Sequence, residues 1–237
     1  MKKIAIFSDI HGNLQALNSI LADIEKENVD DIYFLGDMIG FGPCPKECVD
    51  TFMKTKIKAV KGNHEVYQTD DNIKNSLLSE KEKKHRDWVR SELNEEELEY
   101  IRNLPMYREE LLFGHLFTFC HFFLNQNKDY FEGLDILNDD RVYEVANKIE
   151  TDYLFIGHCH DDFQVHCERF ITCGGSSGCT PNQFTFYLIV EIEGNNVKVI
   201  RKELSYDRKA FERDLLKKNY PERNSVAETF FGIRING

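Results

Sequence analysis

The sequence lacks the long apolar runs and the surplus of basic residues that several classes of protein need. No apolar run approaches the roughly 20 residues of a membrane-spanning helix, and no signal-peptide pattern precedes the first expected strand. Acidic residues outnumber basic ones by 41 to 30, so that the formal net charge is -11. Because nucleic-acid polymers and anionic membranes bind basic surfaces, neither is expected as a partner.

The cysteines also lack the pattern of a structural site. There are seven of them, an odd number, and the Cys44–Cys48 pair has no second Cys or His pair at a matching distance, as a structural zinc site would require. Free thiols and a reducing, cytoplasmic location are expected. The 237 residues contain no repeat, low-complexity segment or linker, and are expected to form a single domain over residues 1–237.

The first third of the chain alternates between expected strands and helices. Strands are expected at residues 3–7, 32–35 and 57–60. Helices are expected at 14–27, after an Asn13 N-cap, and at 45–53, with Pro45 in the first turn. The short connections between these segments predict a largely parallel sheet with helices on its faces.

The remainder of the chain departs from this alternation. A helical insertion is expected at about residues 68–105, with solvated charged runs and with Trp88, Leu93, Leu98 and Ile101 facing inward. A hairpin with a turn at Gly114-His115 should follow. Helices are then expected at 139–149 and 207–218, and strands at 153–156, 163–166, 169–172, 184–191 and 197–204. The tail after Pro221 shows no clear hydrophobic period.

Potential metal ligands follow the ends of the expected strands. The first strand ends in Asp9-x-His11, and residues two apart on an extended chain project the same way. Such a pair at the end of a buried strand is costly unless an ion compensates it. Later strand ends carry Gly36-Asp37, Gly62-Asn63-His64-Glu65, His121 and Gly157-His158-x-His160. Five of the eight histidines lie here, at the edge where parallel sheets bind ligands, which predicts a metal site.

In this order, the motifs resemble those of the calcineurin-like metallophosphoesterases, from residue 2 to about residue 205. The resemblance implies an α/β fold of two packed mixed β-sheets flanked by helices, an αββα sandwich. It implies one metal held by Asp9, His11, Asp37 and His160. A second metal would be held by Asp37, Asn63, His121 and His158, with Asp37 bridging. The resemblance places His64 beside the metals as a proton donor or an electrostatic stabiliser.

The implied ligands suit two divalent transition-metal ions. The ions bring four positive charges and Asp9 and Asp37 return two negative ones, so the site stays positive toward a phosphoryl group. Mixed nitrogen and oxygen ligands favour Mn, Fe, Zn, Ni or Co over Mg or Ca. Two ions about 3.5–4 Å apart can clamp the attacking and leaving oxygens of an in-line displacement. The expected reaction is hydrolysis by in-line attack of a metal-bound hydroxide.

Some residue assignments are less direct. His115 competes with His121, which is preferred because it ends a strand, although Phe122 follows where the family usually has glycine. His85 and His166 are expected to be surface or core residues. No arginine follows Gly36-Asp37, which resembles a smaller bacterial and archaeal phosphodiesterase-like branch. Residues 173–178 replace the Asn-Pro-Gly-Ser motif common there, which leaves the conformation of this loop open.

The expected substrate is a small phosphorylated molecule, such as a nucleotide with a phosphodiester or phosphoanhydride bond. A phosphomonoesterase or phosphoprotein phosphatase is the nearest alternative. A non-catalytic binding scaffold of the same fold is a further one, which the complete ligand set disfavours. Phe41, Tyr67, Phe122 and Phe123 are expected near the rim of the site, either packing there or stacking on a nucleobase.

Overall fold

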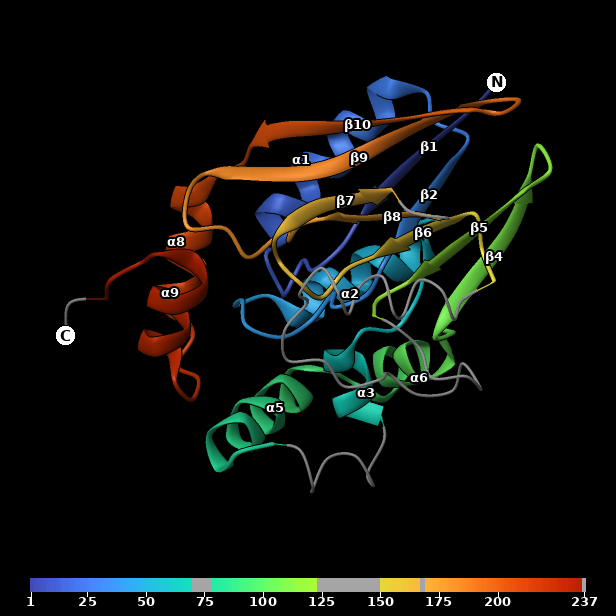
Figure 1. Cartoon of the computed structure of the whole chain (residues 1–237). Helices are drawn as coiled ribbons and strands as arrows, with labels where there is room; N and C mark the ends of the chain where they lie inside the picture. The colour runs from blue at the N-terminus through green and yellow to red at the C-terminus, as the bar shows by residue number, and fades with distance from the viewer. Residues whose placement is uncertain (70–77, 123–149, 167–168, 236–237) are drawn as a thin grey trace.

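The computed structural model describes residues 1–69, 78–122, 150–166 and 169–235. Two five-stranded mixed sheets pack face to face, and helices lie along the outer face of the first sheet and at the ends of the strands (Figure 1). This arrangement confirms the two-sheet architecture that the sequence resemblance implies.

The first sheet combines a parallel unit with an antiparallel hairpin. Its strands in spatial order are β10 (Asn196–Ser205), β9 (Phe184–Glu193), β1 (Lys2–Phe7), β2 (Asp31–Phe34) and β3 (Lys58–Ala59). The pairs β1–β2 and β2–β3 are parallel, as the strand–helix alternation predicts. The β9–β10 hairpin joins β1 in antiparallel orientation, which makes the sheet mixed rather than largely parallel.

The second sheet carries a hairpin at one edge. Its strands in spatial order are β4 (Tyr107–Leu112), β5 (His115–Cys120), β6 (Tyr153–Ile156), β8 (Phe170–Gly174) and β7 (Asp162–His166). Strands β5, β6 and β8 run parallel, so their carboxyl ends reach the same edge. The β4–β5 turn lies at Phe113-Gly114, where both residues have positive φ as in a type I′ turn. The expected turn at Gly114-His115 was therefore one residue late.

The described helices are α1 (Leu14–Glu27), α2 (Pro45–Lys54), α3 (Asn63–Thr69), α5 (Glu80–Glu92), α6 (Glu95–Asn103), α8 (Arg208–Lys217) and α9 (Arg223–Phe231). The sequence reading missed α9 in the tail after Pro221. Its buried residues Val226, Ala227 and Phe231 pack against Phe211 and Leu215 of α8. The expected helix at 139–149 lies outside the described residues.

The side chains of β1 point alternately toward the second sheet and toward the helices. Ile4 and Ile6 point between the sheets, where they join Phe117 and Phe119 of β5 in one buried cluster. Ala5 and Phe7 belong to a second cluster, which includes Leu17 of α1 and Phe52 of α2. Both faces of β1 are thus buried, as its unbroken apolar sequence predicts.

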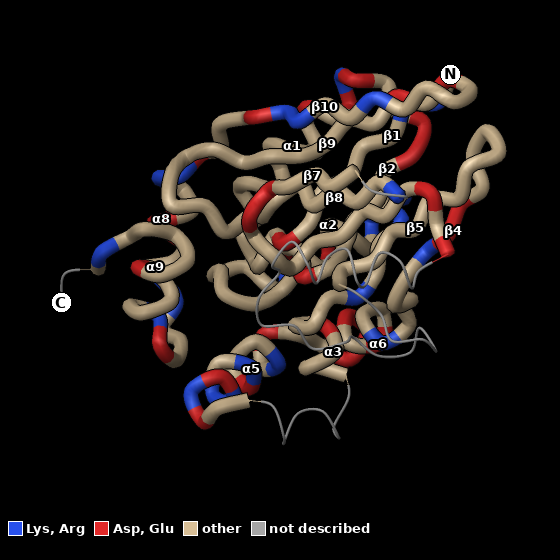
Figure 2. Tube along the Cα trace, viewed as in Figure 1, with Lys and Arg blue, Asp and Glu red and all other residues tan. Residues whose placement is uncertain are grey.

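The helical insertion packs through few residues and exposes its charges. Leu93, Leu98 and Ile101 are buried and Trp88 is partly buried, as predicted. Basic and acidic residues are interspersed along α5 and α6 (Figure 2). No described helix combines the length and apolar character that a bilayer crossing requires.

Candidate metal centre

The structure brings all seven predicted metal ligands to adjoining strand ends. Asp9 and His11 follow β1, Asp37 follows β2, and Asn63 begins α3 beyond β3. His121 follows β5, while His158 and His160 follow β6. The first four ligands therefore come from the first sheet and the last three from the second. The centre lies where the two sheets meet.

Sharp backbone turns aim these side chains inward. Five of the seven predicted ligands have positive φ: Asp9 (56°), His11 (47°), Asp37 (61°), His158 (69°) and His160 (59°). This left-handed conformation is uncommon outside glycine, and several such residues in one place are typical of functional sites. Gly36 has a further constraint, because a Cβ there would lie 2.7 Å from Gly62 Cα and 2.9 Å from His121 Nδ1. The loops around the centre are therefore closely packed.

The first group of donors consists of Asp9, His11, Asp37 and His160. His11 Nε2 lies 3.0 Å from His160 Nε2 and 3.7 Å from both Asp9 Oδ1 and Asp37 Oδ2. His160 Nε2 lies 3.5 Å from Asp9 Oδ1. Atoms that each lie about 2.0–2.2 Å from one ion are separated by roughly these distances. Asp9, His11 and His160 therefore fit a single metal ion, and Asp37 lies as far from His11 as Asp9 does.

The second group consists of Asp37, Asn63, His121 and His158. His121 Nε2 lies 3.3 Å from Asp37 Oδ2 and 3.0 Å from Asn63 Oδ1. His158 Nδ1 also lies 3.0 Å from Asn63 Oδ1. Asp37 Oδ2 faces both groups, which is the placement that a bridging ligand requires. The residues present fit a pair of ions.

Backbone carbonyls orient two of the histidines. His121 Nδ1 donates to Leu35 O at 2.8 Å, and His11 Nδ1 donates to Ile39 O at 3.3 Å. Because a carbonyl only accepts, each Nδ1 carries a proton, so Nε2 is the ring atom that would bind a metal ion. Partners of this kind set the tautomer of metal-binding histidines.

Buried charge dominates the electrostatics of the centre. Burial would raise the pKa of Asp9, but hydrogen bonds from His11 and His160 hold it well below its usual range. Burial lowers the pKa of His121, yet the charges of Asp37 and Asp9 outweigh it and raise that pKa to about 10. The two buried carboxylates thus attract positive charge strongly. A metal cation bound here would compensate the same negative charge.

Glu65 holds the loops after β2 and β3 through hydrogen bonds, a role that the sequence motifs did not predict. Its fully buried carboxylate accepts hydrogen bonds from Asp37 N (2.7 Å), Met38 N (3.0 Å), Ile39 N (3.3 Å) and Gly62 N (2.7 Å). Burial and the charge of Asp37 raise the pKa of Glu65 to about 7. The only sequence signal was its place directly after Asn63-His64.

The loop at residues 173–178 holds the opposite side of the centre. Ser176 Oγ donates to Asp9 O at 2.9 Å, and Ser176 N donates to His160 O at 3.1 Å. Gly178 N also donates to Asp9 O, at 2.9 Å. Asn13, the predicted N-cap, accepts from Ala16 N and donates to Gly178 O. Without the proline of the related motif, this loop still fixes the backbone of two predicted ligands.

Two further side chains approach the donor groups. A ring nitrogen of His64 lies within 4.8 Å of donor atoms of His11 and Asp37, and the His64 backbone N–H donates to Asp37 Oδ1 at 2.9 Å. Cys179 approaches His11 and His160 similarly. Burial raises the pKa of the Cys179 thiol well above its usual range, which disfavours the thiolate that binds metals.

The remaining histidines lie elsewhere. His115 begins β5 and contacts Asn195 Oδ1 at 3.3 Å, so the structure places His121, not His115, at the centre. His85 is buried, with Nε2 3.1 Å from Gly40 O, and His166 is exposed. These locations agree with the core and surface roles expected for His85 and His166.

A cavity of about 630 Å³ opens onto the centre. Phe41 and Tyr67 contribute to its lining, as expected of rim residues. Phe122 is instead buried, with its ring 4.4 Å from that of His158, so it belongs to the core. Phe123 lies outside the described residues.

Residues 2–167 match the family of calcineurin-like phosphoesterases. The chain belongs to this family. An uncharacterised protein of Methanocaldococcus jannaschii is 31% identical over 168 residues, which cover 68% of this chain and 63% of the length of that protein.

Solved structures of similar fold include two with high overlap. A hypothetical protein of Pyrococcus horikoshii has a TM-score of 0.81 at 20% identity, covering 99% of this chain and 100% of its own. A metallophosphoesterase of Sphaerobacter thermophilus has a TM-score of 0.72 at 24% identity, covering 95% and 98%. At these identities the likeness establishes the shared fold.

Proposed function

We propose that the protein is a two-metal phosphoesterase that hydrolyses phosphodiesters or nucleotide-type phosphoanhydrides. The observation that carries the proposal is the position of Asp37 Oδ2, which faces His11 Nε2 at 3.7 Å and His121 Nε2 at 3.3 Å. One carboxylate oxygen thereby lies between two sets of nitrogen and oxygen donors. Membership of the calcineurin-like phosphoesterase family supports the same reaction class.

The residues divide into holding and reacting groups. Asp9, His11, Asp37 and His160 would hold one ion, and Asp37, Asn63, His121 and His158 the other. Bound divalent ions such as Mn, Fe, Zn, Ni or Co would supply Lewis acidity and an activated water. The protein would hold these ions and exclude bulk water with the packed loops around Gly36 and Ser176.

His64 is positioned to act on the substrate. Its backbone is anchored to Asp37, and its ring stands edge-on to His11 with 4.9 Å between centroids. Burial lowers the pKa of His64 to about 3, so in the protein without metal or substrate the ring is neutral. A neutral imidazole donates one N–H, and this group would bind a phosphoryl or leaving-group oxygen.

The proposal is tested by comparing bis-p-nitrophenyl phosphate with p-nitrophenyl phosphate on chelator-stripped protein reloaded with Mn²⁺. We expect metal-dependent turnover in which the diester dominates. Dominant monoester turnover would replace the diesterase assignment with that of a phosphatase. If two ions bind and neither ester is hydrolysed, the proposed activity on simple esters is wrong.

The same assay separates the role of His64 from that of a ligand. His64→Ala should keep both ions and lose about 100-fold or more of the turnover, which is within the usual range for a general acid or an electrostatic donor. Metal content is measured by mass spectrometry, and His166→Ala, at an exposed histidine, serves as the control. A fall in bound metal in His64→Ala would show that His64 is a ligand.

A further inference from the structure

The cavity extends far beyond the proposed ligands. Beyond the proposed ligands and His64, it is lined by α5, through residues such as His85, and by α9, through Val226 and Phe230. Its volume of about 630 Å³ exceeds what a phosphoryl group alone would fill, and lies within the range of roughly 300–1,000 Å³ seen for small-molecule sites. Substrate selectivity is therefore expected to depend on the part of the cavity wall that faces the metal centre.

The part of this wall nearest the metal centre is aromatic. The Phe41 and Phe230 rings stack with centroids 3.8 Å apart and planes at 11°. Phe41 lies 4.6 Å from the His11 ring, Phe230 lies 6.4 Å from the His160 ring, and Tyr67 lies 5.7 Å from the His64 ring. A group attached to a phosphoryl bound between these histidines would meet ring faces and edges first.

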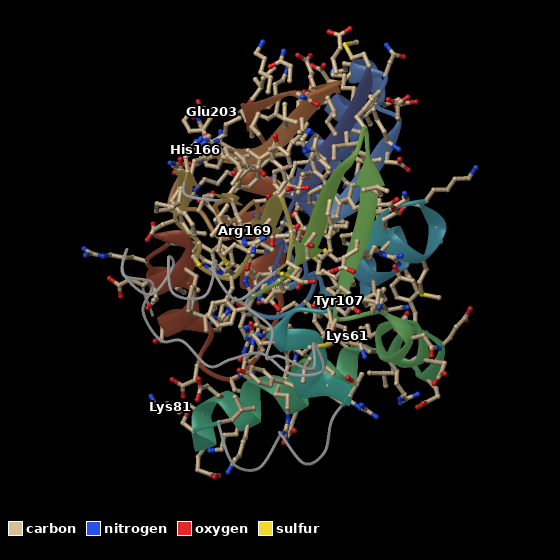
Figure 3. All side chains as sticks on the ribbon, turned by 45° about the vertical axis from the view of Figure 1, so that its right-hand side comes forward. Lys61, Lys81, Tyr107, His166, Arg169 and Glu203 are labelled. Atoms are coloured by element: carbon tan, nitrogen blue, oxygen red, sulfur yellow. The ribbon has the colours of Figure 1, made fainter. Side chains whose placement is uncertain are left out.

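The outer part of the wall is charged but locally neutralised. Among the described lining residues the Lys and Arg side chains are Lys81 and Arg86. Lys81 pairs with Glu222 at 3.0 Å, and Arg86 pairs with Asp87 at 2.6 Å. Figure 3 shows Lys81 on α5, away from the strands of the two sheets. A polyphosphate chain would compete with the acidic partners of both cations, so this wall favours an uncharged arm.

Resting on the proposed function, we propose that α9 and Phe41, in the connection between β2 and α2, select phosphodiesters that carry one phosphoryl group and an uncharged, ring-bearing arm such as a nucleoside. Phe230 supplies a ring beside the arm, and Val226 supplies apolar surface on the same helix. Stacking on aromatic rings tolerates different bases. The wall should therefore discriminate between arms with and without a ring more strongly than between different bases.

The test uses three p-nitrophenyl esters with Mn²⁺-loaded protein: methyl p-nitrophenyl phosphate, thymidine 5′-(p-nitrophenyl phosphate) and the γ-p-nitrophenyl ester of thymidine triphosphate. The first two share the leaving group and the charge and differ in the arm. We expect kcat/KM for the thymidine monophosphate ester to be at least about tenfold above both others. A higher value for the triphosphate ester would overturn the inference.

Variants of α9 then locate the effect. Phe230→Ala should reduce the thymidine advantage about tenfold, the order expected for one lost stacking contact, and should change the methyl ester less than about threefold. Phe230→Tyr should retain the advantage. Thr229→Ala, at an exposed neighbouring position, should behave as wild type. Equal loss on both esters, with folding intact by thermal melting, would show that Phe230 serves packing alone.

The two proposals fail in different ways. If the methyl ester is hydrolysed in a metal-dependent way and the thymidine ester is no better, the phosphodiesterase activity stands and the inference about the wall is wrong. If two ions bind and none of the three esters is cleaved, the proposed function itself is contradicted, and the inference with it.

Discussion

Glu65 binds the backbone of the loops that carry the proposed metal ligands Asp37 and Asn63 of the first sheet. Its carboxylate receives four backbone N–H groups from the loops after β2 and β3. These bonds hold Asp37 at its positive φ and set the start of α3, where Asn63 lies. A side chain that binds no metal thus determines where two proposed ligands point.

Replacing Glu65 by glutamine should loosen the metal centre without removing a ligand. The amide keeps the shape, but its NH₂ group cannot accept a hydrogen bond and would face backbone donors. We expect Mn²⁺ affinity to fall about 10–100-fold and the free energy of unfolding to fall by about 2 kcal/mol or more. Calorimetric titration and chemical denaturation measure the two effects. Unchanged affinity would show that the loops hold their shape without Glu65.

The ligands were predictable from sequence, whereas their supports were not. Asp9, Asp37 and His158 stand directly after apolar strands, in motifs that can be read from the chain. Glu65 and Ser176 act through hydrogen bonds to backbone atoms 26 or more residues away, Ser176 on Asp9 and Glu65 on Met38 and Ile39. Such bonds depend on how the loops approach each other, and side-chain type alone does not show this.

At the scale of elements, α9 shows where sequence periodicity fails. Its buried residues include adjacent pairs, Val226-Ala227 and the partly buried Phe230 beside Phe231. This spacing fits a helix that packs on α8 with one side and lines the cavity with another. Because two partners bury two faces, the single apolar stripe that identifies an amphipathic helix is lost.

Helix α1 is tied to both neighbouring strands at its C-terminal end. Glu27 accepts hydrogen bonds from Lys3 of β1 at 2.5 Å and from Lys202 of β10 at 2.6 Å. Hydrogen bonds from Lys202 and Lys3 lower the pKa of Glu27 from 4.5 to about 2. A carboxyl whose pKa is lower in the folded state contributes stability above its unfolded pKa and loses it in acid.

Glu27→Gln should therefore destabilise the protein at pH 7 and have little effect near pH 2. We expect a cost of about 1 kcal/mol, discounted for screening at this partly exposed position, or roughly 2–4 °C in Tm. The difference from wild type should shrink as the pH falls from 4.5 toward 2. Melting curves of chelator-stripped protein measure it, with Glu25→Gln at an exposed position of α1 as the control. A difference that persists unchanged in acid would rule out the ion pairs as its cause.

At the scale of the whole molecule, the proposed metal centre joins the two sheets. Asp9 and Asp37 come from the first sheet, and His121 and His158 from the second. The interface also contains the apolar cluster around Ile4 and Phe119, so apolar packing holds the sheets together as well. Sequence patterns predicted the strands, and the family resemblance implied how the sheets pair. The position of the antiparallel β9–β10 hairpin depends on long-range pairing that strand patterns do not encode.

The charge balance of this interface predicts that one substitution costs more stability with metal than without it. Asp37 is 2% exposed and shares the centre with Asp9, which is fully buried. Asparagine tolerates the positive φ and can keep the hydrogen bond from His64 N, so Asp37→Asn changes mainly the charge. Without metal the variant loses the attraction between Asp37 and the protonated His121, which holds the pKa of Asp37 well below its usual range, and it should melt below the wild-type Tm.

With Mn²⁺ the difference should widen. Metal at about 100 times its Kd stabilises the folded protein by about 2.7 kcal/mol, or roughly 5–10 °C for a chain of this size. Asp37→Asn should lose most of this gain because the bridging oxygen no longer carries charge. Asp50→Asn, on α2 outside the centre, should respond as wild type does. Melting curves with and without Mn²⁺ decide the matter: if Asp37→Asn gains as much as wild type, Asp37 does not bridge the ions, and the centre does not join the sheets in this way.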